Sequence, residues 1–390
     1  NPNILEEARE KDRQFQEREK KHQIFGIPVL LKDNINTAGL PTTAGAVALQ
    51  NNQTGDAFIV ERLKENGALI LGKANLSEWA YFFCGDCPSG YSAIGGQTLN
   101  PYGRKIIDTG GSSSGSAVAV AANFAPAAVG SETSGSILSP SSSNSLVGLK
   151  PTIGVLSRGG IIPISSTLDT PGPITKSVID NAILFSAMTG NDPRDPASAE
   201  NQNQDDDFYS DITQKELAGQ RLGAIKPLME DSLYVAAVED LRAAGAEVIE
   251  FEPEEVSLPN FTRLLNLDMQ KDLPEYFENY GGPGEMRSVE DVMAFNTEDS
   301  LNRAPYGQKL FQGIVNDTAS EEEFAAIKDT LQRNGRQFFE VPMEEHNLDG
   351  IISINNYHAG FAAVAQYPAI TVPMGYGEDN APKVLTFIAK

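Results

Sequence analysis

The chain has 390 residues, 40% hydrophobic and 21% charged, with a formal net charge of −23 at pH 7. This composition is that of a globular protein with a large core, and the acidity argues against nucleic acid or an anionic membrane as a partner. No apolar run approaches the roughly 18–20 residues of a membrane span. The first residues lead into a charged helix and not a signal peptide, so we expect a cytoplasmic protein.

Short apolar runs alternate with helical patterns along the first half of the chain. We expect an exposed helix at 5–21, a strand at 27–31, a helix at 56–66, a strand at 68–71, a turn-rich stretch at 90–101, a helix at about 115–124, strands at about 126–130 and 147–151, and a helix at 180–189. The run Ser141–Ser143 is interpreted as a loop or a helix start.

The second half begins with a polar, acidic stretch within 191–220. A strand at 221–225, a helix at 232–244 and a strand at 246–251 then predict parallel pairing across a helical crossover. Residues 260–345 are mainly helical and could cover a pocket, and strands return at 348–354 and 369–373. The whole pattern predicts an α/β protein with one large mixed sheet and helices on both faces.

Two glycine-serine runs, Gly110–Ser116 and Gly130–Ser136, are the most informative motifs. Such runs are typical of flexible linkers, but apolar segments at 117–122 and 125–129 adjoin these two. Tight turns held between buried elements suit a serine nucleophile instead. Ser136 is the candidate, because the backbone N–H groups of Thr133, Ser134 and Gly135 could converge into an oxyanion hole beside it.

A serine nucleophile needs a base, and none of the three histidines lies near either run in the sequence. A neutral lysine is the alternative, and burial lowers the pKa of a lysine because the charged form loses its water. Lys32 ends the apolar run 26–31, although a head group in solvent is an equal possibility. Lys73 and Lys150 also follow short apolar strands, and the local pattern does not rank the three.

Cys84 and Cys87 could form a redox pair or half of a zinc site, but the sequence offers no second half. We interpret them as free thiols in a loop near the pocket, and we expect neither a metal nor an organic cofactor.

Longer motifs make the chain resemble the amidase signature family. They are Gly26-Ile-Pro-Val-Leu-Leu-Lys32-Asp-Asn34, Gly95-Gly-Gln-Thr-Leu-Asn-Pro101, Gly110-Gly-Ser112-Ser-Ser-Gly-Ser116, Gly130-Ser-Glu-Thr-Ser-Gly-Ser-Ile137, Gly148-Leu-Lys-Pro-Thr152, Asp169-Thr-Pro-Gly172 and Tyr367-Pro-Ala-Ile-Thr-Val-Pro373. The resemblance implies one domain over 1–390, with the catalytic motifs in 26–190 and a variable helical excursion at 255–345. Family members carry further helices at both ends, so the resemblance also implies a chain truncated at both ends.

The family's catalytic residues are a serine, a second serine after a cis peptide bond, and a lysine. By position the resemblance makes Ser136 the nucleophile, Ser112 the bridging serine and Lys32 the base, with Ser113 as the runner-up for Ser112. The hydroxyls of the other serines in the first run, Ser113, Ser114 and Ser116, are then expected to bond nearby backbone.

Glu132-Thr-Ser-Gly-Ser136 and Gly111-Ser-Ser-Ser-Gly-Ser116 depart from the commoner family patterns and resemble bacterial peptide amidases. We therefore expect hydrolysis of a peptide C-terminal amide or a small amide, in a largely apolar pocket with Tyr357 or Phe361 near its wall. The alternatives are a glutaminase subunit of a transfer-RNA amidotransferase, a non-catalytic binding module on the same fold, and phosphate binding by the glycine-rich run. The sequence leaves the particular amide and the oligomeric state open.

Overall fold

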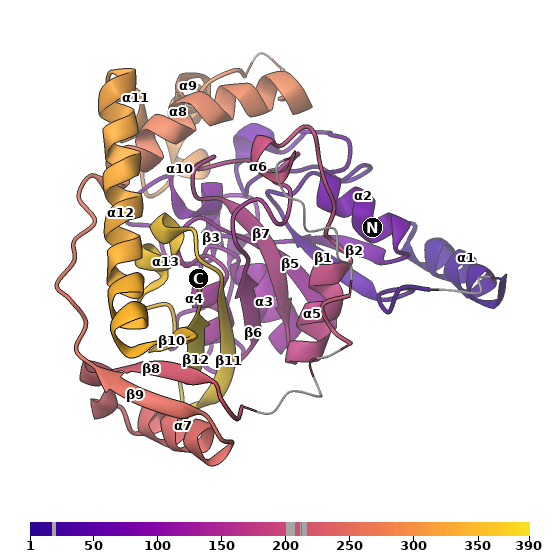
Figure 1. Cartoon of the computed structure of the whole chain (residues 1–390). Helices are drawn as coiled ribbons and strands as arrows, with labels where there is room; N and C mark the ends of the chain where they lie inside the picture. The colour runs from indigo at the N-terminus through magenta and orange to yellow at the C-terminus, as the bar shows by residue number, and fades with distance from the viewer. Residues whose placement is uncertain (18–20, 200–206, 211, 213–216, 285) are drawn as a thin grey trace.

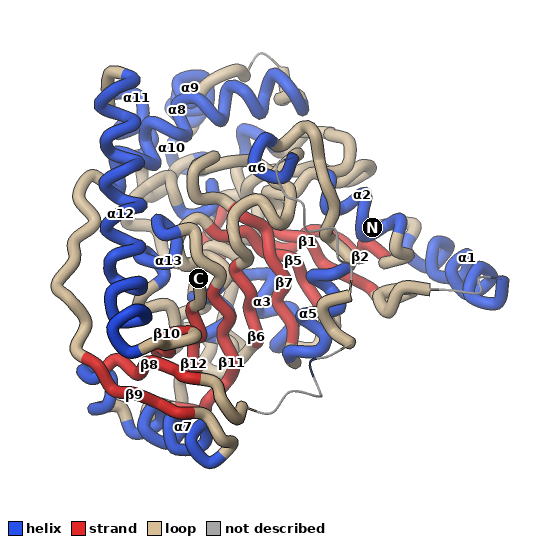
Figure 2. Tube along the Cα trace, viewed as in Figure 1, coloured by secondary structure: helices blue, strands red, loops and turns tan. Residues whose placement is uncertain are grey.

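The computed structural model describes residues 1–17, 21–199, 207–210, 212, 217–284 and 286–390 (Figure 1). One sheet of ten strands runs through the centre (Figure 2). In order across the sheet the strands are β2 (Leu69–Ala74), β1 (Pro28–Lys32), β5 (Ala127–Glu132), β7 (Thr170–Thr175), β6 (Val147–Lys150), β11 (Ala369–Tyr376), β12 (Pro382–Ile388), β10 (Gly350–Ile354), β8 (Arg221–Ile225) and β9 (Glu247–Phe251).

The sheet is mixed, as predicted. The strand pairs at its two ends, β2–β1–β5 and β10–β8–β9, are parallel, and the pairs between them are antiparallel. The predicted crossover at 221–251 is present, because β8 and β9 pair in parallel and α7 (Ser232–Ala243) connects them. A separate short hairpin joins β3 (Tyr91–Ser92) and β4 (Gly96–Gln97) in the turn-rich stretch.

Helices cover both faces of the sheet, and the alternation of side chains along the strands shows which helix covers which face. Val29 and Leu31 of β1 pack with α2 and α5, whereas Leu30 packs with α3 on the opposite face. In the other half, Ile351 of β10 packs with α12 and α13, and Ile352 packs with α7. These helices are α2 (Phe58–Glu65), α3 (Ser114–Ala121), α5 (Val178–Ser186), α12 (Glu321–His346) and α13 (Ala359–Ala365).

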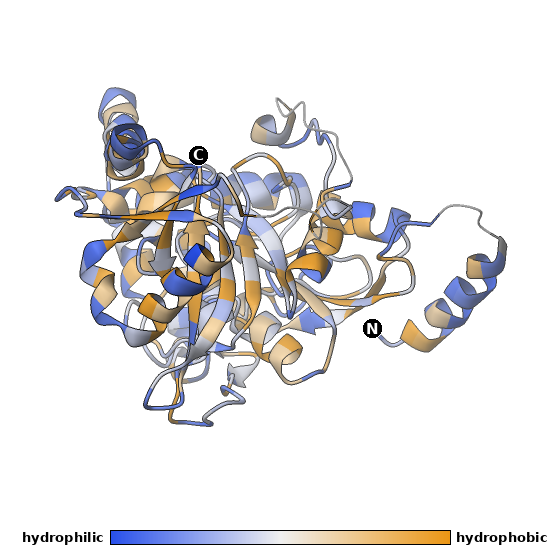
Figure 3. Cartoon of the chain, turned by 60° about the horizontal axis from the view of Figure 1, so that its bottom comes forward, coloured by the Kyte–Doolittle hydropathy of each residue, from blue (hydrophilic) through white to orange (hydrophobic). Residues whose placement is uncertain are grey.

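The remaining helices are α1 (Ile4–Glu17), α4 (Leu138–Ser143), α6 (Pro196–Ala199), α8 (Phe261–Tyr280), α9 (Val289–Glu298), α10 (Ser300–Arg303) and α11 (Lys309–Asn316), with 3-10 turns η1 (Val47–Leu49), η2 (Glu78–Tyr81) and η4 (Lys226–Glu230). Among them, α4 packs against the central strands β6, β11 and β12. The N-terminal helix α1 projects from the edge that β2 forms (Figure 1) and is largely hydrophilic (Figure 3). No helix of the described part combines the length and the apolar character that a membrane crossing requires.

The sequence patterns did not predict strands β7 and β12, and they left helix α4 undecided. Strand β7 carries Pro171 and Pro173, which normally argue against an inner strand because proline donates no hydrogen bond to a neighbour. The prolines are accommodated because the pairing of β7 with β6 covers only Ile174 and Thr175. Strand β12 was likewise not predicted, and Ser141–Ser143 form the last turn of α4 where a loop or a helix start was expected.

The two cysteines are not free thiols. Cys84 and Cys87 are joined in a disulfide, and both lie buried in the apolar cluster that η2, α8 and α11 share. The free-thiol interpretation is therefore wrong, because the short loop between them brings the two side chains together.

Candidate active site

Three strand ends place the predicted site residues at one edge of the sheet. Lys32 is the last residue of β1, Glu132 is the last residue of β5, and Thr170 is the first residue of β7. Because β1 and β5 are parallel and β7 runs antiparallel to them, these three ends meet at the same edge. Ligand sites of α/β sheets commonly lie at such an edge.

Lys32 is fully buried, and its ammonium group is held by two serines. Nζ lies 2.7 Å from Ser112 Oγ, 2.9 Å from Ser131 Oγ and 3.1 Å from the Ser131 carbonyl. Burial lowers the pKa of Lys32 to about 7, and the carboxylates of Asp169 and Glu132 offset part of that effect. The amine is thus poised to accept a proton near neutral pH.

Ser112 lies in the turn that leads into α3, and the Gly111–Ser112 peptide bond is cis, as the resemblance implied. Its side chain is fully buried, and its carbonyl accepts a hydrogen bond from Ser77 N–H at 3.0 Å. Gly110 before it has a positive φ of 64°, and a Cβ there would approach the Pro140 backbone to 2.6 Å. Only glycine fits at this position, which explains why the run begins as it does.

The second run folds around Glu132, whose buried carboxylate accepts hydrogen bonds from three backbone N–H groups. Oε1 accepts from Gly135 at 2.8 Å, and Oε2 accepts from Ile137 at 2.7 Å and Leu138 at 2.9 Å. This turn places Ser136 beside the first run, since Ser113 N–H donates to the Ser136 carbonyl at 3.1 Å. Ser136 is 9% exposed whereas Ser112 is fully buried, so Ser136 is the more accessible hydroxyl of the two.

The three residues predicted to form an oxyanion hole have different environments. Gly135 N–H is already bonded to Glu132, while Thr133 Oγ1 donates to Asp169 Oδ1 at 2.5 Å. Within the described residues, the backbone N–H groups of Thr133, Ser134 and Ser136 have no hydrogen-bond acceptor. These N–H groups are therefore free to bind an oxygen that a ligand would bring.

The structure separates Lys32 from the two lysines that the sequence left open. Lys73 pairs with Asp33 at 3.4 Å and donates to Thr42 Oγ1, and Lys150 Nζ donates to the carbonyls of Pro151 and Tyr367. Neither ammonium group bonds a serine of either run. The other serines of the first run bond backbone as expected: Ser113 to Ser131 O, Ser114 to Gly110 O and Ser116 to Val129 O.

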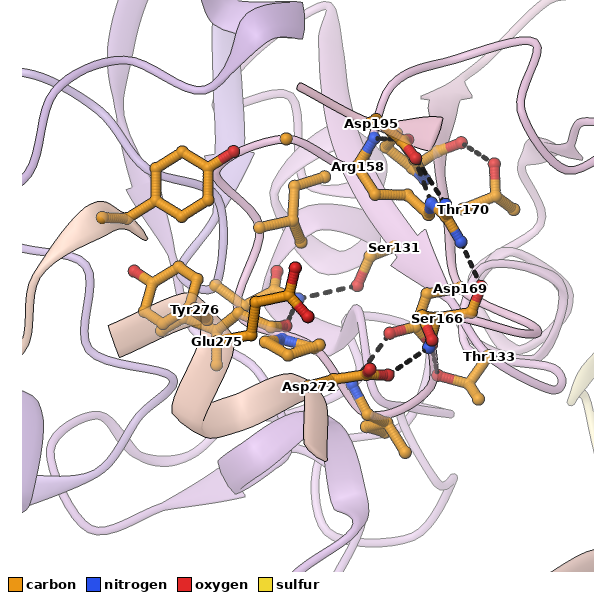
Figure 4. A pocket seen from close by; sticks show the side chains of 18 of the residues that line it. Ser131, Thr133, Arg158, Ser166, Asp169, Thr170, Asp195, Asp272, Glu275 and Tyr276 are labelled. Atoms are coloured by element: carbon orange, nitrogen blue, oxygen red, sulfur yellow. Dashed lines mark hydrogen bonds and ion pairs between the residues drawn. The ribbon is translucent and has the colours of Figure 1, made fainter. Parts of the chain in front are cut away.

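A pocket of about 130 Å³ opens beside this cluster (Figure 4). Ser131 and Thr133 line one side, together with Asn34 and Asp169, and helix α8 supplies the other side. The residues from α8 are Asp272, Glu275, Tyr276, Asn279 and Tyr280. The helical segment at 255–345 thus contributes to the wall, although Lys32 and Ser136 themselves are not part of the lining.

We expected Tyr357 or Phe361 in the wall of the pocket, but neither side chain lines it. Ile161, Ile162 and Ile164 do give the pocket apolar surface, as predicted. The lining carries several charged side chains, Tyr357 is 60% exposed, and Phe361 stacks on Phe338 with ring centroids 4.2 Å apart. The 355–361 stretch still adjoins the turn that holds Ser136, because the Asn356 side chain lies against Gly135. The correction concerns which side chains face the pocket, which depends on how α8 packs.

Sequence reasoning did not single out Ser131 or Asn34. Ser131 Oγ accepts from Asn34 Nδ2 at 2.9 Å as well as from Lys32, so it links the buried amine to the pocket wall. Ser131 belongs to the second glycine-serine run, and that run was the available signal. Over the described part of the chain, no group of three or more histidine, cysteine, aspartate or glutamate side chains is placed to hold a metal ion.

Comparison with known proteins identifies the family to which the chain belongs. The family model described as Amidase matches residues 1–390. A probable amidase of Arabidopsis thaliana is 36% identical over 99% of this chain and 78% of its own length. A glutamyl-tRNA(Gln) amidotransferase subunit of Halothermothrix orenii is 39% identical over 62% of this chain, and the match spans half of that subunit.

Comparison with solved structures indicates the same family. An amidase family protein of Bacillus anthracis superposes with a TM-score of 0.95 at 39% identity, over all of this chain and 78% of that one. The native peptide amidase of Stenotrophomonas maltophilia superposes with a TM-score of 0.93 at 38% identity, over all of this chain and 84% of that one. The glutamyl-tRNA(Gln) amidotransferase subunit of Thermotoga maritima gives 0.69 at 27% identity, over 95% of this chain and 81% of that one. The chain therefore belongs to the amidase family, and it is a hydrolase that acts on amides.

Proposed function

We propose that the chain hydrolyses the C-terminal amides of peptides, or small carboxamides, through an acyl-enzyme formed on Ser136. The observation that carries this proposal is the contact of 2.7 Å between the fully buried Lys32 amine and the Ser112 hydroxyl, next to the turn that holds Ser136. A neutral amine bonded to a hydroxyl is the arrangement that activates a serine without histidine.

In the proposed first half-reaction, protons move toward Lys32. The neutral Lys32 amine takes the proton of Ser112, Ser112 takes the proton of Ser136, and Ser136 Oγ forms a bond to the amide carbon. The carbonyl oxygen becomes negatively charged, and the free N–H groups of Thr133 and Ser134 are the donors that we assign to it. We leave Gly135 N–H out of this role because Glu132 already accepts its hydrogen bond.

The second half-reaction restores the enzyme. The proton on Lys32 returns through Ser112 to the amide nitrogen, the C–N bond breaks, and ammonia leaves. A water molecule then attacks the ester carbon and gives its proton through Ser112 to Lys32. That proton returns through Ser112 to Ser136 Oγ as the ester bond breaks and the carboxylic acid leaves. Every step uses only the lysine, the two serines and water.

The similarity to a peptide amidase supports the choice of substrate, because that protein superposes over this whole chain and superposes more closely than the amidotransferase protein of Thermotoga maritima. A peptide amidase structure also exists in complex with the competitive inhibitor chymostatin. We further propose that 1–390 act as one domain, with the catalytic residues in 26–190 and the 255–345 segment as the outer wall of the pocket.

The pH dependence should follow Lys32. Its pKa is lowered to about 7 by burial, and only the neutral amine can accept the proton of Ser112. We therefore expect kcat/KM to rise with pH through about 7 and to fall roughly tenfold per pH unit below it. The measurement is ammonia release between pH 5 and 9, and a rate that increases toward pH 5 would contradict the role given to Lys32.

The substrate proposal predicts activity without a partner protein. The isolated chain should release ammonia from an amidated dipeptide in clear preference to free glutamine. Coupled detection of ammonia with each substrate at matched concentrations measures this directly. Preference for glutamine, or activity that needs added subunits, would favour an amidotransferase role.

A further inference from the structure

We propose that the pocket beside Ser131 and Thr133 binds a protonated amine on the acyl part of the substrate, so that the preferred amides are cationic. This inference rests on the proposed function, because it names the substrate class of the same site. It adds a subsite for positive charge to a pocket that the sequence predicted to be largely apolar.

Carboxylates outnumber arginines among the side chains that line the pocket. Its two arginines are already paired: Arg158 bonds Asp195 through Nε at 3.0 Å, and Arg194 bonds Asp192 at 2.8 Å and Glu61 at 2.9 Å. Three other lining carboxylates, those of Asp169, Asp272 and Glu275, take part in no ion pair with any described residue. The lining therefore holds more carboxylates than arginines, and the charge of Arg158 acts on Asp169 and Asp272 without forming an ion pair with either.

Asp272 is the most telling of these carboxylates, because it is 8% exposed and yet has no cationic neighbour in contact. It accepts a hydrogen bond from Ser166 N–H at 2.5 Å and from the Ser166 hydroxyl. Burial raises the pKa of Asp272 to about 7, and the nearby carboxylate of Asp268 adds to the rise. A bound ammonium group would reverse that effect, since an opposite charge favours the ionised carboxylate.

A second and independent observation is an unsatisfied acceptor in the same wall. Asn34 is 2% exposed, lines the pocket, and its Oδ1 accepts no hydrogen bond from any described residue. In the orientation that the structure has, Nδ2 donates to Ser131 Oγ at 2.9 Å and to the Ile162 carbonyl at 3.4 Å. A buried acceptor left unpaired costs stability, so an N–H donor of a ligand that reached this oxygen would be stabilised there.

Aromatic rings complete the environment. Tyr276 and Tyr280 both line the pocket, with ring centroids 5.5 Å apart and an angle of 30° between the rings. Figure 4 shows Glu275 beside the Tyr276 ring, with Asp272 reaching toward Ser166 and Asp169 on the facing side. Carboxylates together with tyrosine rings in the lining favour an ammonium group over a neutral or anionic one.

The test is a binding measurement with the full chain carrying Ser136→Ala, which keeps the pocket but should not turn amides over. Two matched pairs of ligands place the charge differently: glycylglycinamide against its N-acetylated form, and N-acetyl-lysinamide against N-acetyl-norleucinamide. Calorimetry should show about tenfold tighter binding of the cationic member in at least one pair, the size expected of one partly desolvated ion pair.

Two further substitutions locate the charge, each in the Ser136→Ala background. Glu275→Gln should reduce the ratio of affinities between cationic and neutral ligand several-fold, and Asp272→Asn should reduce it as well. Glu278→Gln is the matched control, because Glu278 is an exposed residue of the same helix outside the lining. Glu275 is exposed, so its substitution tests the proposal even if Asp272→Asn does not fold.

Two results would overturn the inference: equal affinities within both pairs, or a preference that neither Glu275→Gln nor Asp272→Asn changes. The proposed function is tested separately, by ammonia release from the same four amides with the unsubstituted chain. If none of the four is hydrolysed while the binding preference remains, the proposed function fails and the cation subsite stands. If cationic and neutral amides react and bind equally well, the subsite fails and the proposed function stands.

Discussion

Replacing Ser136 with alanine should lower amide hydrolysis by about 10⁵–10⁶-fold, because the substitution removes the only atom to which the acyl group is proposed to attach. Ser112 cannot replace it, since its hydroxyl is fully buried and bonded to Lys32. Initial rates of ammonia release from an amidated dipeptide measure the loss. A fluorophosphonate probe followed by intact mass should show one adduct on the unsubstituted chain and none on Ser136→Ala.

Ser139→Ala is the matched control for this experiment. Ser139 lies in α4, close in sequence to Ser136, and is partly exposed, so its hydroxyl is also open to the probe. We expect this variant to be labelled like the unsubstituted chain. Labelling that persists in Ser136→Ala would mean that another hydroxyl is the nucleophile, and the whole assignment would then fail.

The second large effect is expected for Lys32→Met, which should lower kcat/KM by about 10³–10⁴-fold. Methionine fills a space similar to that of the lysine side chain, but it cannot accept the proton of Ser112. The rise in rate through about pH 7 should disappear with the amine, because that rise reports the titration of Lys32. A merely structural role for Lys32 would lower the rate and leave the shape of the pH profile unchanged.

Further variants test whether the expected loss is specific to Lys32 and its contact with Ser112. Lys176 is exposed, and Lys176→Met should keep both the rate and the pH profile, which controls for the loss of one lysine. Ser112→Ala should cost about as much as Lys32→Met, and the double variant should be hardly worse than either alone, because both residues serve one proton path. Fully additive losses would show that Lys32 and Ser112 act independently.

Much of the scaffold could be predicted because local patterns specify local structure. The parallel β8–α7–β9 unit and the buried strands β1 and β5 follow from short apolar runs bounded by turns. Strand β7 could not be predicted, since Pro171 and Pro173 contradict every local signal for an inner strand. Strand β7 pairs with β5 along its whole length, prolines included, but with β6 only at Ile174 and Thr175, and this is a property of the assembled sheet.

The pocket also has features that the sequence could not predict, because they depend on packing. Its wall combines residues 158–171, which lead into and begin β7, with Asp272 and Glu275 of α8, which are about a hundred residues away in the sequence. The sequence pattern of α8 does not predict which of its acidic side chains face another segment of the chain. An apolar wall with Tyr357 or Phe361 was expected because an amide presents an uncharged end, but Phe361 stacks on Phe338 and neither side chain lines the pocket.

The sequence by itself determined the two glycine-serine turns, the lysine at a strand end and the family that these motifs indicate. It could do so because tight turns require glycine at particular backbone angles and the chemistry requires hydroxyl and amine groups at set positions. Only the tertiary structure decided that Lys32, and neither Lys73 nor Lys150, contacts Ser112, because all three follow similar apolar strands. Their pKa values and partners depend on which strand ends meet at one edge of the sheet, and that is settled by strand order, which local sequence does not encode.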